Sequence, residues 1–319
     1  MQNLLAGKTA RALEILSFVV PCHNEGENTE LLYKRIGEMS EKNKIDFELI
    51  FVDDSNDQTP LHILKMNQSD PRVKMIRLTR SYGQSVAIFA GLEASRGNAV
   101  IVMDSDLEDP PESVPLFLEQ WQEGFDVVVA ERKRVNLSVS YRLFSNLYYY
   151  LSSKISQVEI PRNVGEFRLL DRRVVDVLLK FPERVKFFRG LTLWPGFKIK
   201  ILLVQREART HGVTNYNFMR AASVAIDGLV SFSLVPLRLI AFAGILMSGV
   251  SVLATLSYFV WKVASGETFE FGWASMGLLM LFTTSINLCF LGIVAEYVGR
   301  IFQQVQGRPQ YVVDYKVGF

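Results

Sequence analysis

The stretch Val100–Glu112, VIVMDSDLEDPPE, passes from an apolar run directly into a cluster of five carboxylates. Its apolar part, rich in β-branched residues, predicts a buried strand over 99–106. Side chains two apart on a strand point to the same side, so we expect Asp104 and Asp106 to face one way from its end. Two carboxylates with a third nearby suit Mg²⁺ or Mn²⁺, which take oxygen ligands and share them with substrate phosphates.

The end of the same stretch has a simpler interpretation as the start of a helix. Asp109 stands in the position of a cap, Pro110 and Pro111 suit a first helical turn, and Glu112 complements the helix dipole. That explanation does not account for Asp104 and Asp106, which precede the turn.

On both sides of this stretch, apolar runs alternate with segments of helical periodicity. The pattern predicts strands at 15–21, 47–54, 73–79, 99–106 and 125–132, and helices at 25–43, 59–68, 84–95 and 110–124. This order predicts an α/β fold with a Rossmann-like, doubly wound, mostly parallel sheet. Ligands bind such sheets beyond the carboxyl ends of the strands, where polar residues converge here. The glycine-rich phosphate loops of dinucleotide-binding and P-loop proteins are absent.

The bulk composition excludes several classes of function. The chain of 319 residues is long enough for one large or two modest domains. A net charge of +2 gives no strong electrostatic case for binding nucleic acid. The two cysteines, Cys22 and Cys289, form neither a disulfide framework nor a zinc pattern.

The last third of the chain is predicted to enter a membrane as a helical hairpin. Residues 239–261 and 271–295 contain no charged side chain, and each run exceeds the roughly 20 residues that a helix needs to cross a bilayer. Arg238, Arg300 and Arg308 flank the pair, so the positive-inside rule places both termini in the cytoplasm. No signal peptide is expected at the N-terminus. Two buried core helices of a soluble protein are the alternative.

Several motifs, in this order, resemble the inverting glycosyltransferases of family 2, which have the GT-A fold. Within that family the chain is most similar to the polyprenyl-phosphate glycosyltransferases, bacterial relatives of dolichyl-phosphate mannose synthase that include bactoprenol glucosyltransferases. The resemblance runs nearly end to end and rests on VVPCHNEGEN (19–28), FVDDSNDQT (51–59), the block 78–112 with its Asp-X-Asp, GEFRLLDRRVVD (165–176), FFRGLTLWPGFK (187–198) and EYVGRIFQQVQGRP (296–309).

The resemblance implies residues that bind the donor and the metal ion. Those expected to contact the nucleotide sugar are Pro21, Glu25, Asp53, Asp104 and Ser105. Those expected to hold Mg²⁺ or Mn²⁺ are Asp104, Asp106 and Glu108, the last in a position where relatives usually carry Gln.

The resemblance also implies residues for the acceptor and for catalysis. Those expected to position the acceptor phosphate are Arg132, Arg142 and Ser145. Those expected to act in catalysis are Asp106, Glu166 and Arg168. Glu166 stands where relatives usually carry Asp, and one extra methylene shifts the carboxylate by roughly an ångström, which matters for catalytic geometry.

The implied reaction transfers a hexose from a nucleotide sugar to undecaprenyl phosphate, with inversion, at the cytoplasmic face of the bacterial cytoplasmic membrane. UDP-glucose is the leading donor, and GDP-mannose and aminoarabinose donors remain open. Two helices form too small a bundle to conduct the lipid product, so we expect a separate flippase and a downstream glycosyltransferase. A homo-oligomer also remains open.

Four parts are expected along the chain: a GT-A domain (1–185), an amphipathic junction on the membrane surface (186–232), two transmembrane helices (233–300) and a cytoplasmic tail (301–319). The alternative for the junction is an ordinary strand and helix packed on the sheet. Three rival functions are a processive polysaccharide synthase, a nucleotidyltransferase and a membrane-anchored nucleotide-sugar binder without turnover. The first is disfavoured because the chain lacks a Gln-X-X-Arg-Trp block and further membrane helices.

Overall fold

The computed structural model describes residues 11–132, 164–183, 186–205, 235–265 and 273–319. The chain divides into two compact units. One comprises Met1–Gly228 together with Arg308–Phe319, and the other comprises Leu229–Gly307. We call the first the catalytic unit and the second the helical unit.

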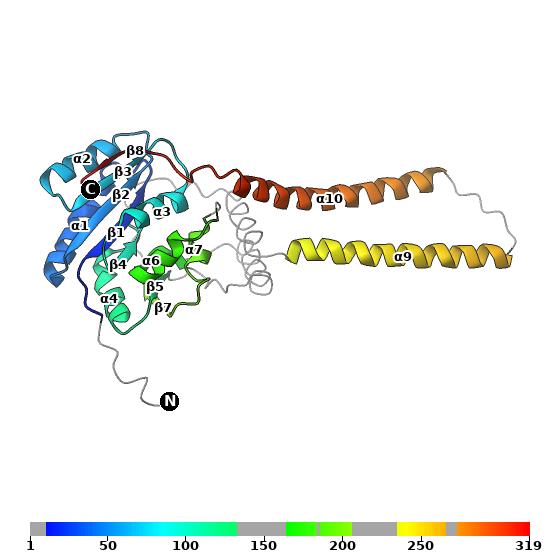
Figure 1. Ribbon diagram of the computed structural model, residues 1–319, viewed down its shortest axis with the longest axis horizontal. Helices are drawn as coiled ribbons and strands as arrows, with labels where there is room; N and C mark the ends of the chain where they lie inside the picture. Colours follow the sequence, from blue (N-terminus) through cyan, green and yellow to red (C-terminus); the bar gives the residue numbers. More distant parts are fainter. Residues whose placement is uncertain (1–10, 133–163, 184–185, 206–234, 266–272) are drawn as a thin grey trace, which may run out of the picture. The chain divides into compact units, whose positions relative to one another are not determined.

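The catalytic unit is built on an eight-stranded sheet, seen in Figure 1, with the order β7-β5-β6-β4-β1-β2-β3-β8. The strands are β1 (Leu16–Cys22), β2 (Phe47–Asp53), β3 (Val73–Leu78), β4 (Ala99–Val102), β5 (Val127–Arg132), β6 (Val164–Asp171), β7 (Ile199–Val204) and β8 (Val313–Val317). β6 and β8 run antiparallel to their neighbours, and the other six run in one direction. The predicted mostly parallel sheet is therefore confirmed.

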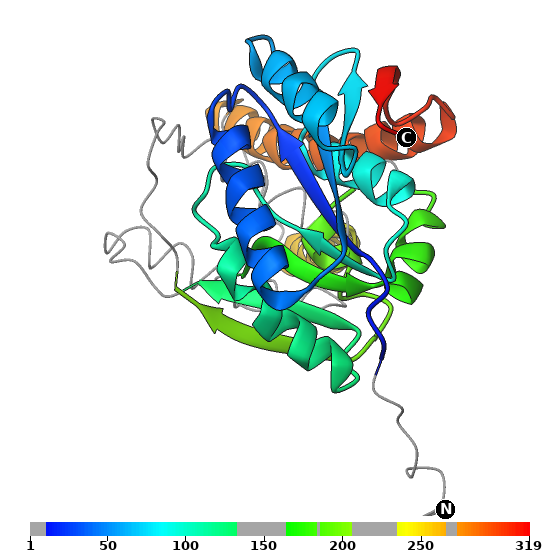
Figure 2. The ribbon, with the colours of Figure 1, turned by 90° about the vertical axis from the view of Figure 1, so that its left-hand side faces the viewer.

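Helices cover both faces of the sheet, as Figure 2 shows. α1 (Asn28–Asn43), α2 (Thr59–Ser69) and α4 (Val114–Gln122) pack on one face, and α3 (Gln84–Ala94), α6 (Arg172–Leu179) and α7 (Phe188–Leu191) on the other. Gly91 lets α3 approach β1 closely, because a Cβ at that position would lie 2.3 Å from Cγ1 of Val19. This close packing fixes the start of α3 beside the carboxyl ends of the strands.

The stretch that opened the sequence analysis folds differently from its prediction. β4 ends at Val102, so Asp104 and Asp106 lie on the turn that follows and not on the strand. The residues in the cap positions of the 3₁₀ helix Pro111–Ser113 and of α4 are Pro110 and Ser113, so Asp109 is not the cap.

Glu112 has a tertiary role beyond the predicted dipole interaction. It forms a two-pronged ion pair with Arg35 of α1, with N–O distances of 2.6 and 2.8 Å. Burial alone would raise the pKa of Glu112, but the hydrogen bonds and charge of Arg35 and a backbone hydrogen bond together outweigh it, so the net pKa is lowered.

Two segments join the sheet beyond the expected domain boundary at residue 185. β7 pairs in parallel with β5, and α7 packs against β6, so the described part of the junction belongs to the catalytic unit. The remainder of the junction, 206–234, lies outside the described residues. The tail also returns to the sheet, because β8 pairs with β3.

The helical unit contains two long helices, α9 (Val235–Ser265) and α10 (Trp273–Val305), which contact each other. Among the described residues, one stretch, Ile286–Val305 in α10, is long and apolar enough to cross a membrane by length and composition. The two predicted helical segments are therefore present, and the two-span hairpin stays a prediction.

Candidate active site

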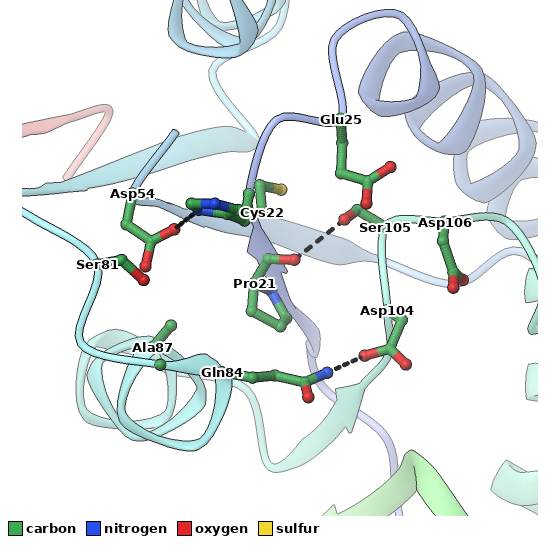
Figure 3. Close-up of a pocket in the computed structure, with 12 residues that line it drawn as sticks. Pro21, Cys22, Glu25, Asp54, Ser81, Gln84, Ala87, Asp104, Ser105 and Asp106 are labelled. Carbon is green, nitrogen blue, oxygen red and sulfur yellow. Dashed lines mark hydrogen bonds and ion pairs between the residues drawn. The ribbon is translucent and has the colours of Figure 1, made fainter. Parts of the chain in front are cut away.

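A cavity of about 340 Å³ lies where the carboxyl ends of β1, β2 and β4 meet the start of α3 (Figure 3). It is lined by Pro21, Cys22, His23, Glu25, Asp54, Ser81, Gly83, Gln84, Ala87, Asp104, Ser105 and Asp106. Figure 3 shows Asp104 and Asp106 on one side of the cavity and Asp54 and Ser81 on the other. Four of the predicted donor-binding residues, at 21, 25, 104 and 105, therefore border one cavity.

Hydrogen bonds hold the acidic side of the cavity in place. Gln84 Nε2 at the start of α3 donates to Asp104 Oδ1 at 2.6 Å. Ser105 Oγ donates to the carbonyl of Pro21 at 3.1 Å, which ties the turn after β4 to β1. The turn is anchored at Leu107, a buried residue with a φ of 62°. A leucine rarely adopts this backbone conformation, and such strain is typical of functional sites.

The residues of the acidic side fit a shared metal site. Within the described residues, no three His, Cys, Asp or Glu side chains come close enough together to hold a metal ion by themselves. Mg²⁺ is commonly bound through one or two carboxylates and the oxygens of a substrate phosphate, without an all-protein cage. Asp104 and Asp106 provide such a pair at the cavity, and the backbone N–H of Glu108 donates to Asp106 Oδ1 at 3.2 Å.

One of the predicted donor-binding residues does not line this cavity. Asp53 was expected to contact the nucleotide, but its carboxylate is fully buried and pairs with Arg77 of β3. Its neighbour Asp54 lines the cavity instead. Cys22 also lines the cavity, and burial raises the pKa of its thiol well above the ordinary value, so the sulfur is neutral near pH 7.

His23 and Asp54 form a pair on this side that the sequence analysis did not single out. Asp54 Oδ1 lies 2.7 Å from His23 Nδ1, and the histidine side chain is 54% exposed while the aspartate is 6% exposed. Asn24 stitches the loops after β1 and β2 together, since its N–H donates to Ser55 Oγ and its Oδ1 accepts from the N–H of Asn56, each at 2.8 Å. The loops that carry His23 and Asp54 are thus fixed to each other.

Glu166 and Arg168 lie on β6, next to β4, and both are buried. Arg189 of α7 donates from Nε to Glu166 Oε1 at 2.6 Å. Arg168, expected to act in catalysis, is only 1% exposed; its guanidinium bonds Thr192 Oγ1 and lies 3.7 Å from Glu166 Oε2. Arg168 therefore points into the protein interior, where it also donates to the carbonyl of Gly165 at 2.6 Å. Arg189, 38% exposed, is the arginine of this group nearer to solvent.

The predicted acceptor site is described only at one residue. Arg132 ends β5 and is half-buried. Arg142 and Ser145 lie outside the described residues.

Comparisons with known proteins show to which family the chain belongs. The model of the family described as "Glycosyl transferase family 2" matches residues 17–179. An uncharacterised glycosyltransferase of Synechocystis sp. is 36% identical over 301 residues, which cover 94% of each chain. A bactoprenol glucosyl transferase of Shigella phage SfX is 36% identical over 307 residues, covering 93% of this chain and 98% of that protein.

Among solved structures, a mannosyltransferase of Pyrobaculum calidifontis in complex with GDP-Man and Mn²⁺ aligns with 95% of this chain and 89% of its own, at 15% identity and a TM-score of 0.49. The family assignment rests on the family model and on the sequence relatives. This chain belongs to glycosyltransferase family 2 and is a glycosyltransferase.

Proposed function

We propose that this enzyme transfers a hexose from a nucleotide sugar, with UDP-glucose as the leading donor, to a polyprenyl phosphate, with inversion at the anomeric carbon. The observation that carries the proposal is the cavity at the carboxyl ends of the strands, with Asp104 and Asp106 on its wall. The likeness to a bactoprenol glucosyl transferase over nearly the whole of both chains supports the lipid class of the acceptor.

The acidic side of the cavity is the proposed place of the donor diphosphate. Asp104 and Asp106 would hold Mg²⁺ or Mn²⁺, with Glu108 as a third candidate on the same turn. The bound metal ion would neutralise the charge that develops on the leaving nucleoside diphosphate. Gln84 fixes Asp104, so this carboxylate need not reorganise when the donor arrives.

The acceptor is a phosphate monoester, which is already anionic near neutral pH and needs little help from a general base. One of its oxygens forms the bond to the anomeric carbon as the bond from that carbon to the diphosphate oxygen breaks. Cations must bring the two anions together, and Arg132 and Arg189 are the candidates among the described residues. Glu166, held by Arg189 at 2.6 Å, would orient this arginine or serve as a base.

The acceptor lipid places the reaction at a membrane. Its polyprenyl tail cannot leave the bilayer, so the catalytic unit must work at the surface. We propose that residues 239–261 of α9 and 271–295, most of which lie in α10, span the cytoplasmic membrane as a hairpin with both termini in the cytoplasm. The lipid-linked sugar would then pass to a separate flippase and a downstream glycosyltransferase.

The function is tested with purified full-length protein, undecaprenyl phosphate, and a panel of nucleotide sugars with Mn²⁺ or Mg²⁺, scored by mass spectrometry of the lipid product. We expect a glycosylated lipid phosphate with UDP-glucose and its loss in Asp106→Ala. The matched control is Asp46→Ala, which removes an exposed aspartate just before β2, at the opposite end of the strands from the cavity. No lipid product with any donor would contradict the proposal.

A second candidate is a membrane-anchored nucleotide-sugar binder without turnover. The observation that favours it is the Glu166–Arg189 ion pair, which occupies the carboxylate that stands in place of the family's usual Asp. The two candidates differ in one result: a binder retains affinity for nucleoside diphosphates with no lipid product, whereas the enzyme releases the diphosphate when lipid phosphate is added. GDP-mannose as donor is a further outcome of the same panel.

A further inference from the structure

The C-terminal segment Arg308–Phe319, here called the C-terminal strap, belongs to the catalytic unit although it follows α10 in the chain. Its strand β8 pairs antiparallel with β3, with Arg77 opposite Tyr315 and Leu78 opposite Val313. One residue further on, the N–H of Thr79 donates to the carbonyl of Val312 at 3.1 Å. The strap therefore pairs with β3 as far as its last residue, Leu78, and also bonds Thr79, the first residue of the loop that follows.

That loop, residues 79–83, forms part of the wall of the donor cavity. Ser81 and Gly83 line the cavity, and Gln84 immediately after them bonds Asp104. Inside the loop, Thr79 Oγ1 lies 3.1 Å from the hydroxyl of Tyr82. A loop this short moves with the strand end that carries it, so what holds Thr79 also affects the residues at the cavity.

The strap and the loop pack on the same apolar cluster. Tyr311 and Val313 of the strap and Tyr82 of the loop all pack against buried residues that include Leu78 and Ala87. The hydroxyl of Tyr311 also donates to Glu93 Oε2 of α3 at 2.5 Å. The strap thus contacts both elements between which the loop is suspended, β3 and α3.

The last two residues of the strap pack closely against neighbouring residues of the catalytic unit. Gly318 has a φ of 82°, and a Cβ there would lie 2.6 Å from Asn67 Nδ2 and 3.0 Å from the carbonyl oxygen of Val73. The ring of Phe319 lies 5.3 Å from Lys74 Nζ and 5.6 Å from Lys316 Nζ, within the range of cation–π contacts. Contacts therefore hold the strap near residue 312 and again at residues 318 and 319.

We propose that the C-terminal strap is a positioning element of the donor site. It fixes the end of β3 and the loop 79–83 so that Gln84 meets Asp104, and it thereby sets the affinity for the nucleoside diphosphate. Without it, β3 becomes an open sheet edge with unpaired backbone groups, and the loop loses the bond at Thr79. This inference rests on the proposed function for the identity of the ligand, but the ordering of the loop does not.

The test uses the full chain, a chain that ends at Arg308, and a synthetic peptide of residues 309–319 added back. Amide hydrogen exchange of residues 79–84, measured without nucleotide, should accelerate in the shortened chain and slow again with the peptide. The Kd for UDP or GDP in the presence of Mn²⁺, measured by calorimetry, should rise about tenfold, equivalent to about 1.4 kcal/mol, and recover with the peptide. An unchanged Kd, or exchange that rises equally in β1 and β4, would overturn the proposal.

A pair of glycine variants decides the matter if the shortened chain does not fold. Gly318→Ala should raise the Kd severalfold and accelerate amide hydrogen exchange of residues 79–84, because its methyl group collides with Asn67 and Val73. Gly37→Ala on α1 should change neither, because a Cβ there meets nothing within 4 Å. Equal behaviour of the two variants would refute the positioning role. A full chain that binds neither nucleotide would contradict the proposed function, while the exchange measurement would still decide the role of the strap.

Discussion

The ion pair between Asp53 and Arg77, next to the cavity residue Asp54, gives a sharp test of the structure. Asp53 ends β2 with a fully buried carboxylate, and Arg77 lies opposite it on β3. In Arg77→Met the carboxylate keeps the backbone N–H of Ser55, at 3.3 Å, but loses its charged partner. Leaving one member of a buried ion pair without its partner costs about 3–5 kcal/mol.

The expected loss is large enough to measure by thermal unfolding. For a domain of this size, each kcal/mol corresponds to about 2–4 °C, so the Tm should fall by roughly 6–20 °C. The double variant Asp53→Leu with Arg77→Met should regain most of that loss, because an apolar pair can replace a buried ion pair at little cost. The Tm of the parent, single and double variants is measured by differential scanning fluorimetry in detergent, and the four values form a double-mutant cycle.

Nucleotide binding gives the same experiment a second readout. Because Asp54 lines the cavity and Asp53 does not, the double variant should retain its Kd for UDP with Mn²⁺, whereas Asp54→Asn should weaken binding and also release His23. A loss below about 1 kcal/mol in Arg77→Met would refute the structural role of the pair. Loss of UDP binding in a folded double variant would show that Asp53 contributes to nucleotide binding.

Three further outcomes are expected. Gly91→Ala should destabilise the catalytic unit by up to about 2 kcal/mol in denaturant unfolding, because the clash with Val19 exceeds the helix-propensity gain of about 1 kcal/mol; a more stable variant would contradict the close packing of α3. Burial raises the pKa of Glu48, but the hydrogen bond from Lys74 and others outweigh it, so the net pKa is lowered. The stability that this carboxylate contributes is present above its ordinary pKa of 4.5 and is lost as the pH falls through the folded value. Glu48→Gln should therefore be less stable than the parent protein at pH 7, and its free energy of unfolding should fall less as the pH is lowered. Parallel pH profiles of the two proteins would refute this. Cys22 should resist iodoacetamide at pH 7 in the folded protein and react on unfolding, as mass spectrometry would show, because burial raises its pKa; rapid labelling of the folded protein would contradict its burial.

The alternating half of the fold could be predicted because its strands are apolar runs between helical segments. β1 to β5 all have such runs, and each forms near its predicted place. β6 could not be found this way, because its sequence VGEFRLLD buries Glu166 and Arg168 inside the sheet. β8 was missed for a different reason: VDYKV is an edge strand with polar, exposed positions, and only its partner β3 defines it.

The sequence pattern did not identify every residue that lines the cavity of the candidate site. Converging strand ends indicated this end of the sheet, but neighbouring residues where a strand ends point in different directions. The pattern therefore could not tell Asp53, which turns to Arg77, from Asp54, which lines the cavity. Gln84 carried no signal of its own, since its bond to Asp104 depends on how closely α3 packs on the sheet.

The central claim is that the cavity bordered by Asp104 and Asp106 holds a nucleoside diphosphate together with a divalent cation. The most direct measurement is calorimetric titration of UDP, and in parallel GDP, into the full chain with Mn²⁺, after chelation with EDTA, and in Asp106→Asn beside Asp46→Asn. We expect binding with Mn²⁺ that EDTA abolishes, Asp106→Asn greatly weakens and Asp46→Asn leaves unchanged. Equal affinity in Asp106→Asn, or undiminished affinity after chelation, would contradict the account.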